Sequence, residues 1–255
     1  MASAGTGRIR IGTSGWQYDH WKGPFYPREL ARRGFLGYYA ERFDTTEVNS
    51  FFYGLPKADT VASWRQAVPA DFAFAVKASR YITHMKKLKD PEASLARFRE
   101  RIDLLGSQLG PILFQLPPNW GANPDRLRAF LQALPKGPRY TFEFRDPSWF
   151  TPEVLGLLED YGAAFCIYEL GEQVSPLTVT ADFAYVRLHG PEAGYRGDYG
   201  EGALESWAHQ LRHWQGQGLD TYLFFDNDEA GYAALDGMRL RRLLGQEGEG
   251  EETGS

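Results

Sequence analysis

Short runs of β-branched and aromatic residues alternate along the chain with stretches whose apolar residues recur at helical spacing. The runs predict eight strands, near residues 8–13, 44–49, 72–77, 111–116, 140–145, 163–168, 183–189 and 220–226. The other stretches predict helices near residues 28–42, 58–67, 91–107, 124–133, 151–161, 201–216 and 230–243. This alternation favours an α/β fold, a single (β/α)₈ TIM-type barrel, with a doubly wound open sheet as the alternative. The connection 169–182 lacks helical spacing, so the helix between the sixth and seventh strands is expected to be missing.

Polar residues in the predicted strands gather at the C-terminal end of each strand. Alternate strand residues point to opposite faces. If Phe142 and Phe144 face the helices, Glu143 and Arg145 face the barrel interior. The same alternation gives the inner face Glu47, Asn49, Lys77, Gln115, Glu143, Arg145, Arg187, His189 and Asp226. Active sites of TIM barrels are built at this end of the strands.

Aromatic residues follow several of these strands, most densely in the loop 14–27. A polar floor beneath an aromatic rim is typical of a ligand pocket. The residues expected to contact a ligand from the rim are Trp16, Tyr18, Tyr53, Trp149 and the polar Asn227. The alternative is that the rings pack the loops onto the barrel, which general burial statistics favour for about half of them.

Composition bears on the partners and the cellular compartment to be expected. Four of the acidic residues lie in the Gly/Glu-rich segment 245–255, and without them the formal charge of −5 becomes −1. Charge therefore does not discriminate for or against nucleic acid. The single cysteine excludes an intramolecular disulfide, and no segment suggests a signal peptide or a membrane span. We expect a cytoplasmic monomer with a disordered segment 1–7, a barrel domain over 8–244 and a disordered tail over 245–255.

Seven motifs together resemble the YecE-like family, whose members are uncharacterised and classed as a domain of unknown function. They are "GTSGWQYDHWKGPFYP", "TTEVNSFFYGLP", "FAFAVKASRYITH", "LFQLPP", "FEFRDPSW", "YVRLHG" and "LFFDND". The resemblance covers about residues 9–243 and implies a TIM-barrel fold, without implying an established activity. The family has a pair of asparagines where this chain has Asp226 and Asn227, so this chain carries an additional carboxylate there.

The inward polar set suggests acid–base chemistry on an anion. Glu143 or His189 would serve as general base, while Asp226 and Glu47 would orient partners or bind Mg²⁺ or Mn²⁺. Lys77, Arg145 and Arg187 would hold a phosphate or carboxylate group. A structural salt-bridge network remains the alternative for the same residues.

The segment 77–89, "KASRYITHMKKLK", carries five Lys or Arg residues and no acid. Basic residues beside aromatic ones are typical of single-stranded nucleic-acid surfaces, although a charge run is more often a solvated face. Two functions are therefore open. The first is a hydrolase acting on a phosphodiester or another anionic substrate, with or without a metal. The second is a non-catalytic module that binds a phosphorylated metabolite or a single strand, which carboxylates occupied by arginines would favour.

Overall fold

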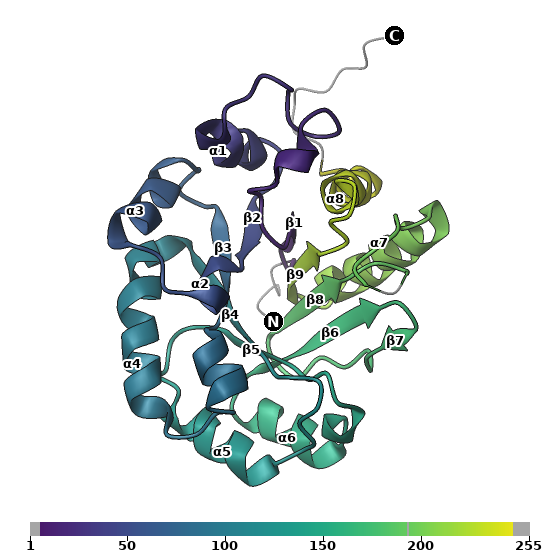
Figure 1. Ribbon diagram of the computed structural model, residues 1–255. Coiled ribbons are helices and arrows are strands. Elements are labelled where there is room, and N and C mark those ends of the chain that lie inside the picture. Colours follow the sequence, from purple (N-terminus) through teal and green to yellow (C-terminus); the bar gives the residue numbers. More distant parts are fainter. Residues whose placement is uncertain (1–5, 193, 247–255) are drawn as a thin grey trace. The chain divides into compact units, whose positions relative to one another are not determined.

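All eight predicted strands are present in the computed structural model, which describes residues 6–192 and 194–246 (Figure 1). Each strand end lies within two residues of its expected position. The strands are β1 (Ile9–Thr13), β2 (Thr45–Val48), β3 (Ala73–Lys77), β4 (Leu109–Gln115), β5 (Tyr140–Glu143), β6 (Ala164–Leu170), β8 (Phe183–Leu188) and β9 (Asp220–Phe225). Parallel strands that alternate with helices make this an α/β fold of the (β/α)₈ TIM-barrel type, as the sequence predicts.

Most helices also agree with the expectation. They are α3 (Ala58–Gln66), α4 (Pro91–Ile102), α5 (Pro124–Ala133), α6 (Pro152–Asp160), α7 (Glu201–Gly216) and α8 (Tyr232–Leu243). Two of them begin at side-chain caps, because Asn123 accepts from the Arg126 N–H and Thr151 accepts from the Val154 N–H. Residues 171–182 contain no helix, as expected, but a two-residue strand β7 (Gln173–Val174) that pairs antiparallel with β6.

The predicted helix over residues 28–42 is wrong for its first half. The structure has only a 3₁₀ turn, Arg32–Gly34, followed by α1 (Phe35–Ala40). Leu30 folds back onto Gly34, where a Cβ atom would lie 2.9 Å from Leu30 Cδ1. The Tyr26 ring stacks on Phe35 at 4.1 Å between centroids, so tertiary packing outweighs the local helix propensity here.

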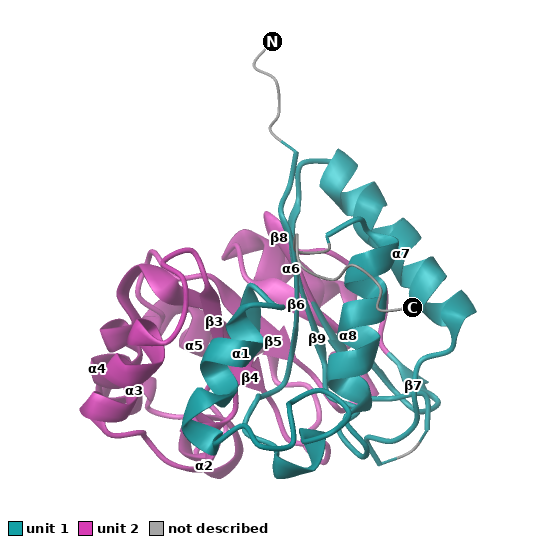
Figure 2. Ribbon diagram, turned by 90° about the horizontal axis from the view of Figure 1, so that it is seen from above, with its two compact units in different colours: residues 1–46, 168–174, 186–255 teal, residues 47–167, 175–185 magenta. Residues whose placement is uncertain are grey.

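The chain divides into two compact units (Figure 2). Unit 1 comprises residues 1–46, 168–174 and 186–255, and unit 2 comprises 47–167 and 175–185. In unit 1, β1 pairs in parallel with β9 from Ile9–Thr221 to Thr13–Phe225, and α7 and α8 pack beside these strands. This confirms the expected pairing of the first and the last barrel strand.

Unit 2 is built on a parallel ladder in which β4 pairs with β3 and with β5. Its apolar face is lined by phenylalanines: Phe114 on β4 stacks on Phe142 at 5.3 Å, and the Phe130 ring of α5 meets Phe114 at 5.0 Å. Phe142 and Phe144 are both fully buried, as the alternation in β5 predicts. The inner face of the same strand therefore carries Glu143.

Parts of the segments expected to be disordered, 1–7 and 245–255, make contacts with the barrel strands and helices. Gly7 is buried and donates its N–H to the Gln215 carbonyl at 3.2 Å, and Gln246 donates its Nε2 to the Ile9 carbonyl at 3.2 Å. Residues 1–5 and 247–255 lie outside the described residues. Among the helices of residues 6–192 and 194–246, none combines the length and the apolar character needed to cross a membrane.

Candidate functional site

The best-defined polar cluster of unit 1 is centred on Asp226, which follows β9. Its Oδ2 atom lies 3.0 Å from Arg187 Nη2 and 2.9 Å from His189 Nδ1. Arg187 belongs to β8 and His189 follows it, so both point from one strand toward the end of its neighbour. Arg187 is 1% exposed and His189 is fully buried, whereas the Asp226 side chain is 17% exposed. These three predicted site residues therefore lie together.

The hydrogen bonds determine which imidazole nitrogen of His189 carries the proton. Arg187 Nη1 lies 3.3 Å from His189 Nε2, and a guanidinium can only donate. Nε2 must therefore accept, and the proton sits on Nδ1, which donates to the Asp226 carboxylate. In this tautomer Nε2 carries the lone pair and is the basic atom of the ring.

Ser14, which follows β1, extends this cluster. Its Oγ accepts from Arg187 Nη2 at 3.3 Å, and its carbonyl accepts from the Tyr18 hydroxyl at 2.6 Å. The next residue, Gly15, has φ of +94°, and a Cβ there would lie 2.9 Å from the Tyr18 oxygen. Only glycine fits this turn, which holds Ser14 beside the guanidinium.

A second carboxylate, Asp228, lies two residues beyond Asp226 in unit 1. Its Oδ1 accepts from Trp21 Nε1 at 2.5 Å and lies 3.3 Å from His20 Nε2. Burial raises the pKa of Asp228 to about 6, the hydrogen bond from Trp21 and the His20 imidazole oppose the rise, and the charge of Asp226 adds to it. Asp228 therefore titrates close to neutral pH.

Unit 2 contains a different carboxylate–arginine pair at the end of β5. Glu143 is fully buried, its Oε1 accepts from Arg145 Nε, and Cys166 Sγ donates to its Oε2 at 3.8 Å. Gln115 pairs in register with Glu143 on the neighbouring strand and donates its Nε2 to the Leu116 carbonyl at 2.8 Å. Three predicted site residues thus share the end of β4 and β5.

Two further predicted site residues lie in β2 or directly after it. Glu47 is fully buried and accepts the Tyr185 hydroxyl at 2.7 Å. Asn49 directly precedes the short helix α2 (Ser50–Tyr53), which the sequence did not predict, and does not cap it. The Asn49 Oδ1 is buried and finds no hydrogen-bond partner among the residues that the structure describes, so it is available to a ligand.

Lys77, the last residue of β3, places its Nζ 4.5 Å from the centroid of the Phe52 ring. The Phe52 ring also meets Tyr53 at 5.2 Å and His84 at 5.1 Å. A cation over an aromatic face is attracted to the ring, so Lys77 is held beside α2 in unit 2.

The expected aromatic rim is only partly available to a ligand. Trp16 is 4% exposed, and Trp149 is fully buried with its ring stacked on Phe144 at 4.7 Å, so both rings pack the loops onto the strands. Tyr18 is half-buried, whereas Tyr53 is 83% exposed.

Asn227 makes hydrogen bonds that hold a loop in place. It is fully buried, and its Nδ2 donates to the Gly197 carbonyl at 2.9 Å and to Asp236 Oδ2 at 2.8 Å. The same Asp236 atom accepts the Tyr199 N–H at 2.9 Å. Asn227 and Asp236 therefore fasten the loop that follows β8 to helix α8.

The candidate carboxylates do not fit a Mg²⁺ or Mn²⁺ ion as they are arranged. Within residues 6–192 and 194–246, no three His, Cys, Asp or Glu side chains are grouped so that they could hold a metal ion. Asp226 and Glu143 each face a guanidinium, and Glu47 accepts from a tyrosine hydroxyl. Hydrogen-bond donors and cations thus occupy positions where a metal would need oxygen ligands.

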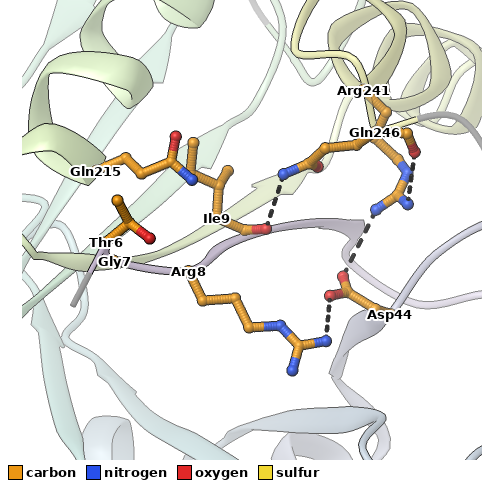
Figure 3. A pocket seen from close by; sticks show the side chains of 8 residues that line it. All are labelled: Thr6, Gly7, Arg8, Ile9, Asp44, Gln215, Arg241 and Gln246. Carbon is orange, nitrogen blue, oxygen red and sulfur yellow. Dashed lines mark hydrogen bonds and ion pairs between the residues drawn. The ribbon is translucent and has the colours of Figure 1, made fainter.

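A pocket of about 510 Å³ in unit 1 lies away from this chemistry, at the N-terminal end of β1 (Figure 3). The two arginines that line this pocket form ion pairs with the Asp44 carboxylate. Arg8 Nη2 lies 3.1 Å and Arg241 Nη1 lies 3.6 Å from its oxygens. Arg10 adds a third ion pair to Asp44 at 3.2 Å. The N-terminal ends of barrel strands serve stability, so we assign these ion pairs to holding β1, β2 and α8 together.

Several contacts near the predicted site were not expected from the sequence. The inward position of Tyr185 could have been predicted from the alternation in β8, because Tyr185 lies on the same side of the strand as Arg187. The Tyr195 ring meets the His189 ring at 5.2 Å, and Ser14 reaches Arg187 through a loop. The sequence contains no signal for the last two contacts, since each depends on loop conformation. Cys166 is buried in β6, and its thiol contact with Glu143 was not expected either.

The comparisons with known proteins agree with the fold. A family model described as "Protein of unknown function DUF72" matches residues 10–254. The UPF0759 protein YunF of Bacillus subtilis is 28% identical over 92% of this chain and 94% of its own length. The UPF0759 protein YecE of Escherichia coli is 32% identical over 56% of this chain and 50% of its own length. These matches confirm the resemblance found in the sequence.

Solved structures give the same result. A DUF72 family protein from Thermotoga maritima superposes with a TM-score of 0.84 and 27% identity, covering 93% of this chain and 99% of its own. A DUF72 family protein from Enterococcus faecalis superposes with a TM-score of 0.81 and 19% identity, covering 96% of this chain and 99% of its own. The fold is thus shared by proteins whose sequences have diverged widely.

Proposed function

The chain belongs to the DUF72 family of proteins of unknown function, and from its own residues we propose that it is a hydrolase acting on a phosphodiester or another anionic substrate. The observation that supports this most is the shared Oδ2 atom of Asp226, which binds Arg187 and orients His189 at the same time. A carboxylate that fixes an imidazole tautomer is the usual partner of a general base.

The three side chains would divide the work as follows. The guanidinium of Arg187 would hold the anionic group of the substrate, which competes with the imidazole for its N–H groups and so frees His189 Nε2. Nε2 would then take the proton of an attacking water as the water oxygen bonds to the electrophilic atom of the substrate, and the adjacent Asp226 carboxylate would stabilise the imidazolium. As the bond to the leaving oxygen breaks, the imidazolium would give that proton to the leaving oxygen, which restores neutral His189. No metal takes part in this step. We place this chemistry in a cytoplasmic monomer whose only cysteine is a free, buried thiol.

The test is a turnover screen across nucleic acids, sugar phosphates and esters, with and without Mn²⁺. On any substrate that is hydrolysed, His189→Gln is expected to lower turnover by about 10²- to 10⁴-fold. His209→Gln, which removes an exposed histidine of α7, is the matched control and should leave turnover unchanged. Undiminished turnover in His189→Gln would overturn the assignment of the base, and an absolute need for Mn²⁺ would overturn the metal-free step.

The second candidate is a non-catalytic module that binds a phosphorylated metabolite or a single strand. The observation in its favour is that Asp226 and Glu143 each pair with an arginine. Ligand binding without turnover of any substrate class, unchanged by His189→Gln, would favour this candidate over the hydrolase.

A further inference from the structure

Unit 2 exposes an unusual group of large side chains beside the ends of β2 and β3. Tyr53 is 83% exposed, Tyr81 is 48% exposed and Met85 is 69% exposed. Rings held in water gain nothing from the core, and exposed aromatic clusters commonly mark binding surfaces. We use the name basic aromatic surface for Phe52, Tyr53, residues 77–89 and Trp120.

Ring and cation contacts join several members of this surface. Phe52 lies between Tyr53, Lys77 and His84, at the ring and cation distances given above. At the other end, Lys87 Nζ lies 5.9 Å from the centroid of the Trp120 ring. Cations therefore lie beside aromatic rings at both ends of the segment 77–89.

The charge of the surface is positive. The segment 77–89 carries five Lys or Arg residues and no acid, and Lys86 forms an ion pair with the exposed Asp90 at 3.6 Å. Burial, together with the positive charges of Lys77 and Arg80, lowers the pKa of His84 to about 4. An anion laid across the segment would meet several cations at once.

The backbone of this segment is held in an uncommon conformation. Residues Tyr81–Met85 form a π-helical turn, a form found frequently at functional sites. Lys87, Leu88 and Asp90 then follow with φ of +47°, +64° and +42°, a region that non-glycine residues rarely adopt. Such strained residues cluster at ligand sites, where the surroundings hold them in place.

One apolar anchor maintains this conformation. The Leu88 side chain is 1% exposed, and its N–H donates to the Ile82 carbonyl at 3.0 Å. The Lys89 N–H donates to the Lys86 carbonyl at 3.0 Å. Because Leu88 is turned inward, Lys87 and Lys89 on either side of it are exposed. The lysines are thus presented by a fixed loop.

We propose that the basic aromatic surface binds single-stranded nucleic acid, with bases stacked on Tyr53 and Tyr81 and phosphates bound by the lysines of residues 86–89. Alternating rings and cations are the chemistry that recognises an unpaired strand, because its bases offer free faces and its backbone carries regular charge. A duplex hides its base faces, and the charges of an acidic peptide alone provide no planar base to stack on the exposed tyrosines. The inference deepens the proposed function by naming a substrate class, and it is measured by binding alone.

The experiment is fluorescence anisotropy of labelled 20-nucleotide oligo-dT with the full chain, across a series of salt concentrations. Tyr53→Ala/Tyr81→Ala is expected to weaken binding at least about 10-fold, because each stacked base contributes substantially. Tyr53→Phe/Tyr81→Phe should retain binding, since the ring faces remain. Lys86→Ala/Lys87→Ala/Lys89→Ala should reduce the slope of log K against log salt by about 2.

Matched controls separate this surface from general charge and exposure. Tyr161→Ala removes an aromatic ring that is 40% exposed elsewhere in unit 2 and should not change binding. Arg97→Ala/Arg128→Ala/Lys136→Ala removes the same three charges from exposed positions and should leave the salt slope within about 0.5 of wild type.

Three results would overturn the inference. They are no binding of oligo-dT by the wild-type chain at low salt, undiminished binding by the double tyrosine-to-alanine variant, and equal binding of duplex DNA or polyglutamate. Failure of the proposed hydrolase is a separate outcome. In that case His189→Gln binds oligo-dT normally, and neither it nor the wild type turns over any substrate.

Discussion

Two aromatic-rich stretches each follow a strand, one in unit 1 and one in unit 2, and their rings differ in exposure. In the loop after β1, the rings of Trp21 and Tyr26 are 0% and 1% exposed. In α2 after β2, Tyr53 is 83% exposed. Composition alone does not distinguish the two, because both combine aromatic and small polar residues.

The difference lies in what each stretch finds to pack against. The loop 14–27 meets rings of α1 and the residues that follow it: Phe25 lies 5.7 Å from Tyr38 and 5.9 Å from Phe43. Its polar ring atoms are satisfied too, since the Tyr26 hydroxyl donates to the Trp16 carbonyl at 2.7 Å. The ring of Tyr53 contacts only the edge of Phe52, a neighbour along α2, among the described aromatic rings. The rings of Trp21 and Tyr26 are therefore core, whereas in α2 the Phe51 ring is buried and the Tyr53 ring lies at the surface.

The largest expected effect is on stability. Tyr26→Ala should lower the free energy of unfolding by about 3–5 kcal/mol, because it removes a fully packed ring and its hydrogen bond. Tyr53→Ala should change it by less than about 0.5 kcal/mol, because nothing in the core is lost. Urea unfolding of both variants measures this difference. Equal losses would show that the Tyr53 ring is part of the core and would end the comparison.

The next effect concerns the buried pair of unit 2. Glu143→Gln should destabilise the fold by about 3 kcal/mol, because it leaves the buried Arg145 without its counter-charge. The sequence favours Glu143 as a possible base, whereas the structure places it against a guanidinium. Melting temperature and turnover of the one variant separate the roles. An unchanged melting temperature with lost turnover would make Glu143 the working carboxylate.

The sequence predicts the strands and the facing of their side chains well, because period-two alternation is a local property. Glu47, Glu143 and Arg187 are buried at strand ends, where that alternation places them. Loop packing is not local, so the sequence could not show that Trp149 stacks on Phe144 or that Ser14 reaches Arg187. The π-helical turn and the left-handed residues after β3 were also missed, because their sequence has no glycine or proline to indicate them.

A smaller effect is expected for Asp228, which accepts a hydrogen bond from Trp21 in the loop after β1. The pKa of Asp228 is raised by burial, so the folded state binds its proton more tightly than the unfolded state. This contribution to stability is fully present below the ordinary aspartate pKa and is lost as pH rises through about 6. Asp228→Asn should therefore match wild type at pH 4 and melt on the order of 2 °C higher at pH 7. A melting-temperature difference that does not change between these pH values would contradict the assignment.

The smallest effect is expected at the C-terminus. Deleting residues 247–255 should leave melting temperature and solubility nearly unchanged, because four glutamates among glycines cannot supply a core face. Gln246 is kept because it donates to the Ile9 carbonyl. A drop of several degrees in a thermal scan would show that this segment docks on the fold.

The most direct test of the proposed site is a crystal structure of the full chain grown or soaked at high phosphate concentration. We expect a tetrahedral anion within hydrogen-bond distance of a guanidinium nitrogen of Arg187, beside His189 Nε2. Phosphate bound at the exposed lysines of residues 86–89 but not at Arg187 would contradict the claim that the Asp226 cluster receives an anionic substrate.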